Sequence, residues 1–311
     1  MRQIFQNLGT GQVQVESVPS PTVEPGKLLI QTECSLISAG TERMLVSFGR
    51  SSLLKKIKSQ PDKVRDVINK IKTEGLVSTL KAVRNKLADP IPLGYSQVGK
   101  VLAIGNGVKG FAVGDRVVSN GSHAEMVVVP QLLCAPVPTK ISSQDAAFTV
   151  VGSIGLQGIR LLAPAIGESI AVMGLGLIGQ LCVQILLANG CKVLAMDIDP
   201  TKVALAESFG ATGLVLRSGE SPLGAAQAFA GQAGMDGVLI TASTPSREPI
   251  LQSAEMCRQR GRIVLVGVVG LDIPRDAFYK KELTFQVSCS YGPGRYDPSY
   301  EGGGHDYPYG L

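Results

Sequence analysis

The sequence predicts an α/β protein, in which a doubly wound parallel sheet covered by helices is joined to a separate antiparallel β domain. Three observations support this prediction. Short strand patterns with turn residues fill residues 1–45 and 91–140, strand and helix patterns alternate from about residue 145 onward, and one glycine-rich stretch links a strand to a helix. With 311 residues, 44% of them hydrophobic and 18% charged, the chain is long enough for two domains with their own cores.

The first domain, residues 1–148, is predicted from short strands in which apolar and polar residues alternate. A period of two places one face of a strand in a core and the other in solvent, and turn residues separate the strands. The segments are GQVQVESVPSP, GKLLIQTECSLIS, QVGKVLAIG, GDRVVS and HAEMVVVP. Their spacing predicts a small antiparallel β domain.

Residues 45–90 interrupt this domain and are predicted to form a basic helical insertion. Apolar residues recur there at helical spacing, and residues 50–86 hold eleven Lys or Arg against three Asp or Glu, a local charge of +8 in a chain of net charge +5. The charge fits a solvated surface, or a lid or groove that attracts an anionic substrate. Nucleic acid is the weaker alternative, because only Phe48, at the edge, adds an aromatic ring.

Residues 149–288 are predicted to form the parallel sheet, because strands and helices alternate there. The strand segments are SIAVMG, CKVLAMD, GLVL, MDGVLITAS and RIVLVGVVG, with LTFQVSCSYG as a candidate last strand. The helical segments are SQDAAFTVVGSIGLQGIRLL, QLCVQILLANG, PTKVALAESFG, LGAAQAFAGQ and REPILQSAEMCRQRG.

The stretch VMGLGLIGQLCVQILLANGCK, from residue 172, has twenty uncharged residues before Lys192, enough to cross a bilayer. A membrane helix is disfavoured, because three glycines crowd its start and the amides of Gln180, Gln184 and Asn189 would lie in hydrocarbon. The stretch instead predicts a strand, a G-x-G-x-x-G turn, a helix, and a second strand that ends at Asp197.

This order predicts a dinucleotide site of the Rossmann type. Gly174 permits the tight turn, Gly176 lets the backbone approach a pyrophosphate, and Gly179 lets helix and strand pack closely. Asp197, 18 residues after Gly179, is placed to accept from both ribose hydroxyls of NAD and to repel the 2′-phosphate of NADP, the less favoured cofactor. Asp199 is an alternative for that role. The predicted cofactor residues are Gly174, Leu175, Gly176, Leu177, Ile178, Gly179, Asp197 and Ile198. A glycine-rich structural turn that binds nothing is the alternative interpretation.

Other chemistry-bearing residues are sparse. Six cysteines occur without a C-x-x-C pair or a close metal-ligand spacing, so buried free thiols are expected. Of the two histidines, His123 is predicted to be structural and His305 to be solvated in a glycine-rich tail. The start, MRQIFQNLGT, has no apolar signal segment, so we expect a cytoplasmic protein without a membrane partner.

Five segments, taken in their order along the chain, indicate a family: GVKGFAVGDRVV, GSHAEMVVVP, SSQDAAF, GLGLIG and GRIVLVGV. Together they resemble the medium-chain dehydrogenase/reductase superfamily, which includes zinc alcohol dehydrogenases and zinc-free quinone and enoyl reductases. The resemblance covers nearly the whole chain. It implies a GroES-like fold for the β domain, a Rossmann fold for residues 149–288, and the activity of an NAD(P)-dependent dehydrogenase or reductase.

The zinc site of that superfamily does not carry over to this sequence. Its Cys-Gly-Thr/Ser-Asp element matches Ala-Gly-Thr-Glu at residues 39–42, and its Gly-His-Glu element matches Gly-Tyr-Ser at residues 94–96. The third ligand position falls near Ser153, and the cysteines of the structural zinc lobe are missing. Because zinc needs three or four thiolate, imidazole or carboxylate ligands, a protein without zinc is expected.

Without zinc, a hydroxyl group has to manage the proton of the substrate. Thr41 matches the relay hydroxyl of the superfamily, and Tyr95 stands where the histidine ligand would face the nicotinamide. We predict that Tyr95 is the general acid/base and that Thr41 and Ser38 position the substrate oxygen. The alternative is that Tyr95 only fills the space of the missing ligand.

Three further segments, ISAGTERMLVSFGRSSLLKK, PLGYSQVG and SCSYGPGRYDPSYEGGGHDYP, resemble a zinc-free bacterial branch encoded with polysaccharide biosynthesis. There the chain is often the first half of a bi-domain oxidoreductase with a Gfo/Idh/MocA-type second half. The resemblance implies an anionic sugar or nucleotide-sugar-like substrate, a homodimer, and a fused or partner domain of that type. Residues 289–311 match only the start of the return to the β domain, so a truncated chain is expected.

Two other functions stay open on the sequence alone. One is a zinc-free quinone or enoyl reductase, in which the β-carbon of an activated alkene receives the hydride. The other is a non-catalytic module that senses nucleotides or binds RNA through the basic insertion.

Overall fold

The computed structural model describes residues 1–50, 89–217, 219–295 and 297–301. The chain forms two compact units, Met1–Val150 and Val151–Leu311. Most of the basic insertion predicted at residues 45–90 lies outside the described residues, as does the tail that carries His305. The predicted α/β fold class is confirmed, because one unit is antiparallel and the other parallel.

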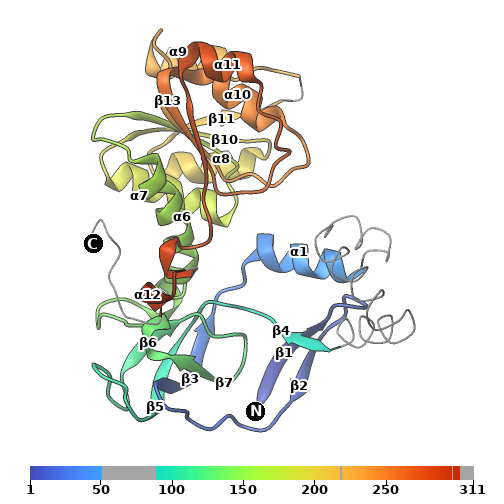
Figure 1. Cartoon of the computed structure of the whole chain (residues 1–311), viewed down its shortest axis with the longest axis vertical. Coiled ribbons are helices and arrows are strands. Elements are labelled where there is room, and N and C mark those ends of the chain that lie inside the picture. The colour runs from blue at the N-terminus through green and yellow to red at the C-terminus, as the bar shows by residue number, and fades with distance from the viewer. Residues whose placement is uncertain (51–88, 218, 296, 302–311) are drawn as a thin grey trace. The chain divides into compact units, whose positions relative to one another are not determined.

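The first unit consists of two antiparallel sheets (Figure 1). One sheet has the strand order β7-β3-β5-β6-β8, and the other has the order β2-β1-β4. Leu28 and Ile30 lie two positions apart on β3 and therefore on the same face of the strand; both are fully buried and form a core with Val101 and Val117. The strands are β1 (Arg2–Asn7), β2 (Val13–Ser17), β3 (Lys27–Ser35), β4 (Pro90–Pro92), β5 (Gln97–Ile104), β6 (Arg116–Ser119), β7 (Met126–Pro130) and β8 (Cys134–Pro136), and the helical elements are α1 (Ala39–Arg50), η1 (Gln131–Leu133) and α5 (Ser143–Ala146).

Helix α1 begins earlier than predicted, inside the region expected to consist of strands. The carboxylate of Glu42 accepts a hydrogen bond of 2.8 Å from the backbone N–H of Ser38, and the backbone N–H of Glu42 donates to the Ser38 carbonyl at 2.9 Å. These bonds pair polar groups that a helix start would otherwise leave without partners. Helical structure therefore starts at Ala39, not at residue 45.

The second unit contains a six-stranded parallel sheet with the order β11-β10-β9-β12-β13-β14. The candidate last strand is present, and it lies at the edge of the sheet. The strands are β9 (Ser169–Met173), β10 (Lys192–Asp197), β11 (Thr212–Val215), β12 (Met235–Ile240), β13 (Cys257–Leu265) and β14 (Thr284–Val287). The helical elements are α6 (Thr149–Leu162), α7 (Leu177–Ala188), α8 (Pro200–Ser208), α9 (Leu223–Ala230), α10 (Glu248–Met256), α11 (Arg275–Lys281), η2 (Pro293–Arg295) and α12 (Pro298–Glu301).

Helices cover both faces of the parallel sheet (Figure 1). Helices α6, α7 and α8 bury Leu162, Leu186 and Ala206 against one face, and α9 and α10 bury Ala226 and Ile250 against the other. This burial explains why the strands are almost continuously apolar. Chain order reverses between β9 and β12, and in a doubly wound sheet a ligand site lies at the carboxyl ends of the strands beside such a reversal.

Two helix boundaries differ from the prediction. The first predicted helix is split into α5 and α6, and the segment CRQRG belongs to β13 and not to the end of α10. The register between β12 and β13 shifts, because Met235 pairs with Cys257 but Gly237 pairs with Arg262. Arg260 lies in the shifted segment with a positive φ of 59°. An irregular parallel pairing of this kind has no local periodicity from which it could be predicted.

No helix among the described residues is both long and apolar enough to cross a membrane. The stretch from residue 172 is instead divided between β9, the glycine turn and α7, as predicted.

Candidate functional site

The glycine turn follows β9 and is fixed by close backbone contacts. Gly174 has a φ of +95°, and a Cβ atom on it would lie 2.5 Å from the backbone nitrogen of Ala242. A Cβ on Gly179 would lie 2.0 Å from the carbonyl oxygen of Gly174. Only glycine fits either position, because the turn packs against the end of β12 and α7 packs against the turn.

Gly176 differs from both of these glycines. It is the N-cap of α7 in an extended conformation with a φ of −69°, and a Cβ on it would meet no atom within 4 Å. Because glycine has no side chain, the N-terminus of α7 has no side-chain cap. Helix α7 therefore begins without a side-chain cap and beside open space at Gly176, which fits an anion such as a pyrophosphate.

Asp197 ends β10 and connects it to the glycine turn. Its Oδ2 accepts a hydrogen bond of 2.6 Å from the backbone N–H of Leu175, and its Oδ1 accepts one of 2.9 Å from the N–H of Asp199. The Nζ of Lys202 lies 4.0 Å from Oδ1. These contacts fix the carboxylate in one orientation, and each oxygen retains a lone pair for a further donor. The next side chain, Ile198, is exposed.

Asp199, the alternative to Asp197 as the ribose ligand, has a different structural role. It is the N-cap of α8, and its Oδ1 accepts from both the backbone N–H and the hydroxyl of Thr201. These hydrogen bonds, together with Lys202 nearby, hold the pKa of the Asp199 carboxyl below its ordinary value. Its carboxylate is thus already engaged in capping.

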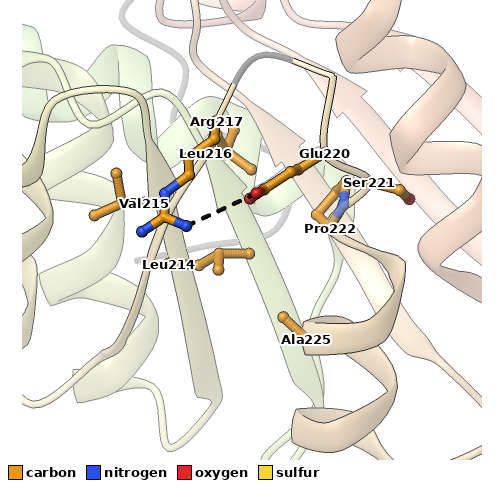
Figure 2. Close-up of a pocket in the computed structure, with 8 residues that line it drawn as sticks. All are labelled: Leu214, Val215, Leu216, Arg217, Glu220, Ser221, Pro222 and Ala225. Carbon is orange, nitrogen blue, oxygen red and sulfur yellow. Dashed lines mark ion pairs between the residues drawn. The ribbon is translucent and has the colours of Figure 1, made fainter.

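A small pocket lies at the carboxyl end of β11, beside β10 (Figure 2). Val215 is the register partner of Asp197, and the N–H of Leu216 donates to the Asp197 carbonyl at 2.9 Å, so the pocket lies beside the backbone of Asp197. Arg217 and Glu220 form an exposed ion pair of 3.8 Å across it. Its lining residues are Leu214, Val215, Leu216, Arg217, Glu220, Ser221, Pro222 and Ala225. This pocket could not be predicted from the sequence, because it is formed by a loop that has no motif.

In the first unit, Tyr95 and Thr41 lie together although 54 residues separate them. The Tyr95 hydroxyl donates to the Thr41 Oγ1 at 3.3 Å, and both side chains are half-buried. Thr41 stands in the first turn of α1, and Tyr95 follows a turn at Gly94, whose φ is +89°. The predicted hydroxyl pair therefore exists in the structure, while its role in catalysis stays a prediction.

Ser38, the third predicted catalytic residue, is buried and takes part through its backbone. Its N–H donates to Glu42, and within the described part of the chain no hydrogen bond joins its hydroxyl to Thr41 or Tyr95. A role of the Ser38 hydroxyl in positioning the substrate oxygen stays a prediction.

A buried polar cluster, which was not predicted from the sequence, includes Glu42, the residue that follows Thr41. The Nε2 of His123 lies 3.2 Å from Glu42 Oε2, and its Nδ1 lies 2.8 Å from the hydroxyl of Ser35. The side chains of His123 and Glu42 are only 5% and 11% exposed. The burial and hydrogen bonds of His123 are compatible with the structural role predicted for it. Its partner Glu42 is 81 residues away, and no spacing rule connects the two.

The donor atoms at the expected zinc positions do not fit the metal. Residue 39 is alanine, which has no ligand atom, and the phenol of Tyr95 donates to Thr41. Among residues that the structure describes, no group of three or more His, Cys, Asp or Glu side chains could hold a metal ion.

Two family models match this chain. One, described as alcohol dehydrogenase GroES-like domain, matches residues 66–139, and the other, described as zinc-binding dehydrogenase, matches residues 178–301. The chain belongs to the medium-chain dehydrogenase/reductase superfamily. It is an oxidoreductase of that superfamily.

Individual superfamily members are similar at moderate identity. An alcohol dehydrogenase of Moraxella sp. (strain TAE123) is 26% identical over 272 residues, which cover 76% of this chain and 79% of the relative. D-xylulose reductase A of Aspergillus oryzae is 25% identical over 244 residues, covering 67% and 68%. A mycobacterial protein solved in complex with NADPH has the same fold, with a TM-score of 0.72 at 20% identity over 98% of this chain and 87% of that protein.

Proposed function

We propose that this superfamily member is an NAD(H)-dependent, zinc-independent oxidoreductase that moves a hydride to or from a carbonyl or alcohol carbon of a sugar or nucleotide-sugar-like substrate. The observation that carries the proposal is the contact between Asp197 and the glycine turn. It places a carboxylate beside an uncapped helix N-terminus that faces open space, as a dinucleotide requires. The related xylulose reductase and alcohol dehydrogenase support the reaction class.

The second unit would hold the dinucleotide with a few groups. The N-terminus of α7 and the backbone at Gly176 fit the pyrophosphate, and the free lone pairs of Asp197 fit the ribose hydroxyls. The pocket beside β11 offers aliphatic side chains for the adenine ring. A 2′-phosphate would meet the Asp197 carboxylate, which favours NAD over NADP, although a structural neighbour carries NADPH.

The first unit would manage the proton. When bound, the nicotinamide supplies or accepts the hydride. In the reducing direction the Tyr95 hydroxyl donates a proton to the substrate oxygen as the carbonyl becomes an alcohol, and in the oxidising direction the phenolate takes that proton back. Thr41, which accepts from Tyr95 at 3.3 Å, orients the phenol. Zinc independence is proposed because the ligand set at these positions does not fit the metal.

The partners of the protein are also proposals. The +8 charge of residues 50–86 fits a phosphate or pyrophosphate on the substrate. A homodimer through the edge strand β14 fits the exposed side chain of Val287 on that strand. A fused or partner Gfo/Idh/MocA-type domain and a cytoplasmic location remain expectations.

The proposal is tested first by titrating the chain with NADH and NADPH and following nicotinamide fluorescence. Tight NADH and weak NADPH binding is the expected result, and binding of neither would contradict the assignment of the cofactor. Turnover is then compared between sugars, nucleotide sugars, quinones and enones, before and after dialysis against a chelator. Activity that depends on added zinc would overturn the metal-free proposal, and quinone turnover without sugar turnover would favour the quinone reductase alternative.

A further inference from the structure

The buried cluster of Ser35, Glu42 and His123 lies next to the hydroxyl pair of Thr41 and Tyr95. The proposed reaction assigns no role to this cluster. The carboxylate of Glu42 accepts from Ser38 at 2.8 Å and lies 3.2 Å from the His123 Nε2. Because a carboxylate only accepts, the ring proton at this contact belongs to Nε2, and Nδ1 is then free to accept from the Ser35 hydroxyl at 2.8 Å.

His123 contacts both segments that carry the hydroxyl pair. Its link to Glu42 holds the first turn of α1, in which Glu42 directly follows Thr41. Its backbone N–H donates to the Leu93 carbonyl at 2.8 Å, which anchors the segment that leads to Tyr95.

The ring of His123 also packs directly against Gly94. A Cβ atom on Gly94 would lie 2.6 Å from the His123 Cγ, and the φ of Gly94 is +89°. The turn before Tyr95 therefore depends both on the missing side chain at residue 94 and on the imidazole plane beneath it.

From these contacts we propose that Glu42 and His123 are positioning residues, which hold the Thr41 and Tyr95 hydroxyls at hydrogen-bond distance and so prepare the phenol for proton transfer. This rests on the proposed function, because it assigns the pair to the same reaction. Neither side chain is accessible to a substrate, since both are almost fully buried, so they act through Thr41 and Tyr95. The buried Glu42–His123 bond is suited to this task because it joins two segments 81 residues apart.

Two substitutions at residue 123 separate the two sides of the ring. The amide nitrogen of Gln in His123→Gln reaches about as far as Nε2 and retains a donor to Glu42, whereas Asn in His123→Asn is shorter and retains only a group near Nδ1. We expect His123→Asn to lower kcat at least tenfold with KM changed less than threefold, and His123→Gln to recover most of that loss. NADH affinity, which belongs to the second unit, should stay within twofold in both variants.

A double-variant cycle then shows whether the effect passes through the phenol. Since positioning matters only while Tyr95 can transfer a proton, His123→Asn combined with Tyr95→Phe should be no slower than Tyr95→Phe alone. The control is Ser119→Ala, which removes the buried hydrogen bonds that the Ser119 hydroxyl accepts from Gln97 at 2.7 Å and from the Gly121 N–H at 3.2 Å, but leaves the contacts of Glu42 and His123 in place; it should lower Tm without lowering kcat. Multiplied losses in the cycle, or equal kcat values for His123→Asn and His123→Gln, would overturn the proposal.

A spectroscopic measurement keeps the inference testable if no substrate is found. The chain has seven tyrosines, so ¹³Cζ-tyrosine labelling gives few NMR signals, and Tyr95→Phe assigns the one from Tyr95. That signal should shift in His123→Asn and stay near its wild-type position in His123→Gln. If His123→Asn does not fold, Glu42→Gln should shift it in the same way. An unmoved Tyr95 signal refutes the positioning role, whereas absent NADH binding and turnover in the wild-type chain refute the proposed function instead.

Discussion

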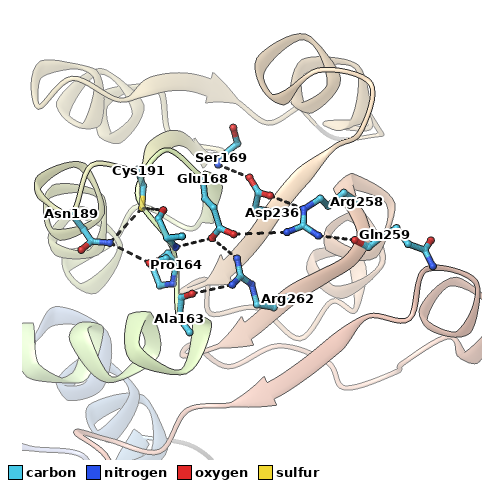
Figure 3. A network of polar contacts seen from close by, with 11 residues as sticks. Ala163, Pro164, Glu168, Ser169, Asn189, Cys191, Asp236, Arg258, Gln259 and Arg262 are labelled. Carbon is cyan, nitrogen blue, oxygen red and sulfur yellow. Dashed lines mark hydrogen bonds and ion pairs between the residues drawn. The ribbon is translucent and has the colours of Figure 1, made fainter. Parts of the chain in front are cut away.

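The two edges of the six-stranded parallel sheet use polar groups in opposite ways. At the carboxyl edge, Asp197 retains free lone pairs, α7 has no side-chain cap, and open space lies above Gly176. At the amino edge, Glu168 and Asp236 are paired with Arg258 and Arg262 in a network of hydrogen bonds and ion pairs (Figure 3).

The amino-edge network joins the starts of three strands. Asp236, at the start of β12, accepts from the Ser169 N–H of β9 at 2.8 Å and from the Arg258 Nε of β13 at 2.6 Å, and this bond raises the pKa of Arg258. Glu168 accepts from Arg262 and from the N–H of Ala165. The charged side chains at the amino edge are paired with one another, so they stabilise the fold. At the carboxyl edge, polar groups remain available to bind a ligand.

The largest expected effect is at the glycine turn. Gly179→Ala would force a Cβ to 2.0 Å from the Gly174 carbonyl oxygen, so we expect a loss of about 3 kcal/mol in the free energy of unfolding and no measurable NADH binding. Gly176→Ala is the matched control, because its Cβ meets nothing and its φ is negative. It should leave the unfolding free energy within about 0.5 kcal/mol and raise the Kd for NADH about tenfold or more. Equal stability of the two variants in urea unfolding would contradict the assigned roles.

At the opposite edge, Glu168→Gln should change stability and leave binding alone. It removes the charge that faces Arg262 in a mostly buried pair, which should lower the unfolding free energy by about 2 kcal/mol. NADH affinity should not change. Glu282→Gln, in an exposed pair with Arg260, is the control and should have almost no effect. Weaker NADH binding by folded Glu168→Gln would show that the two edges are coupled.

A smaller effect, on cofactor affinity, is expected for Asp197→Asn. It tests whether the protein prefers NADH to NADPH. Loss of the charge should weaken NADH binding about tenfold, or about 1.4 kcal/mol, and weaken NADPH binding less, because repulsion of the 2′-phosphate is removed as well. Asp199→Asn preserves an N-cap acceptor and should leave both affinities within about twofold. If Asp199→Asn has the larger effect on the ratio of NADH to NADPH affinity in the fluorescence titration, Asp199 is the ribose ligand.

The smallest expected effect is the pH dependence of the stability that the Asp199 cap contributes. The bonds from Thr201 lower the pKa of folded Asp199, so its stabilising effect is present above the unfolded pKa and is lost as pH falls through the folded one. Asp199→Ala should therefore lower Tm at pH 7, and the difference in Tm from wild type should shrink as the pH falls below the ordinary aspartate pKa of about 4. A difference in Tm that persists at low pH would mean that the cap acts without its charge.

The parallel sheet was predictable because its signals are local. Buried parallel strands are continuously apolar, and the three glycines have roles fixed by nearby backbone, so residues 172–197 indicated their own conformation. The shifted pairing of β12 with β13 was missed, since it depends on a neighbouring strand. So was the early start of α1, which depends on Glu42.

The sequence by itself determined the fold class, the superfamily, the glycine turn with Asp197, and the absence of zinc-type donors at residues 39 and 95, because each depends on residue type and short spacing. Only the tertiary structure decided that Asp199 serves as a helix cap and that Tyr95 donates to Thr41. It alone joined His123 to Glu42, because antiparallel pairing and a helix cap bring together side chains whose distance along the chain carries no signal.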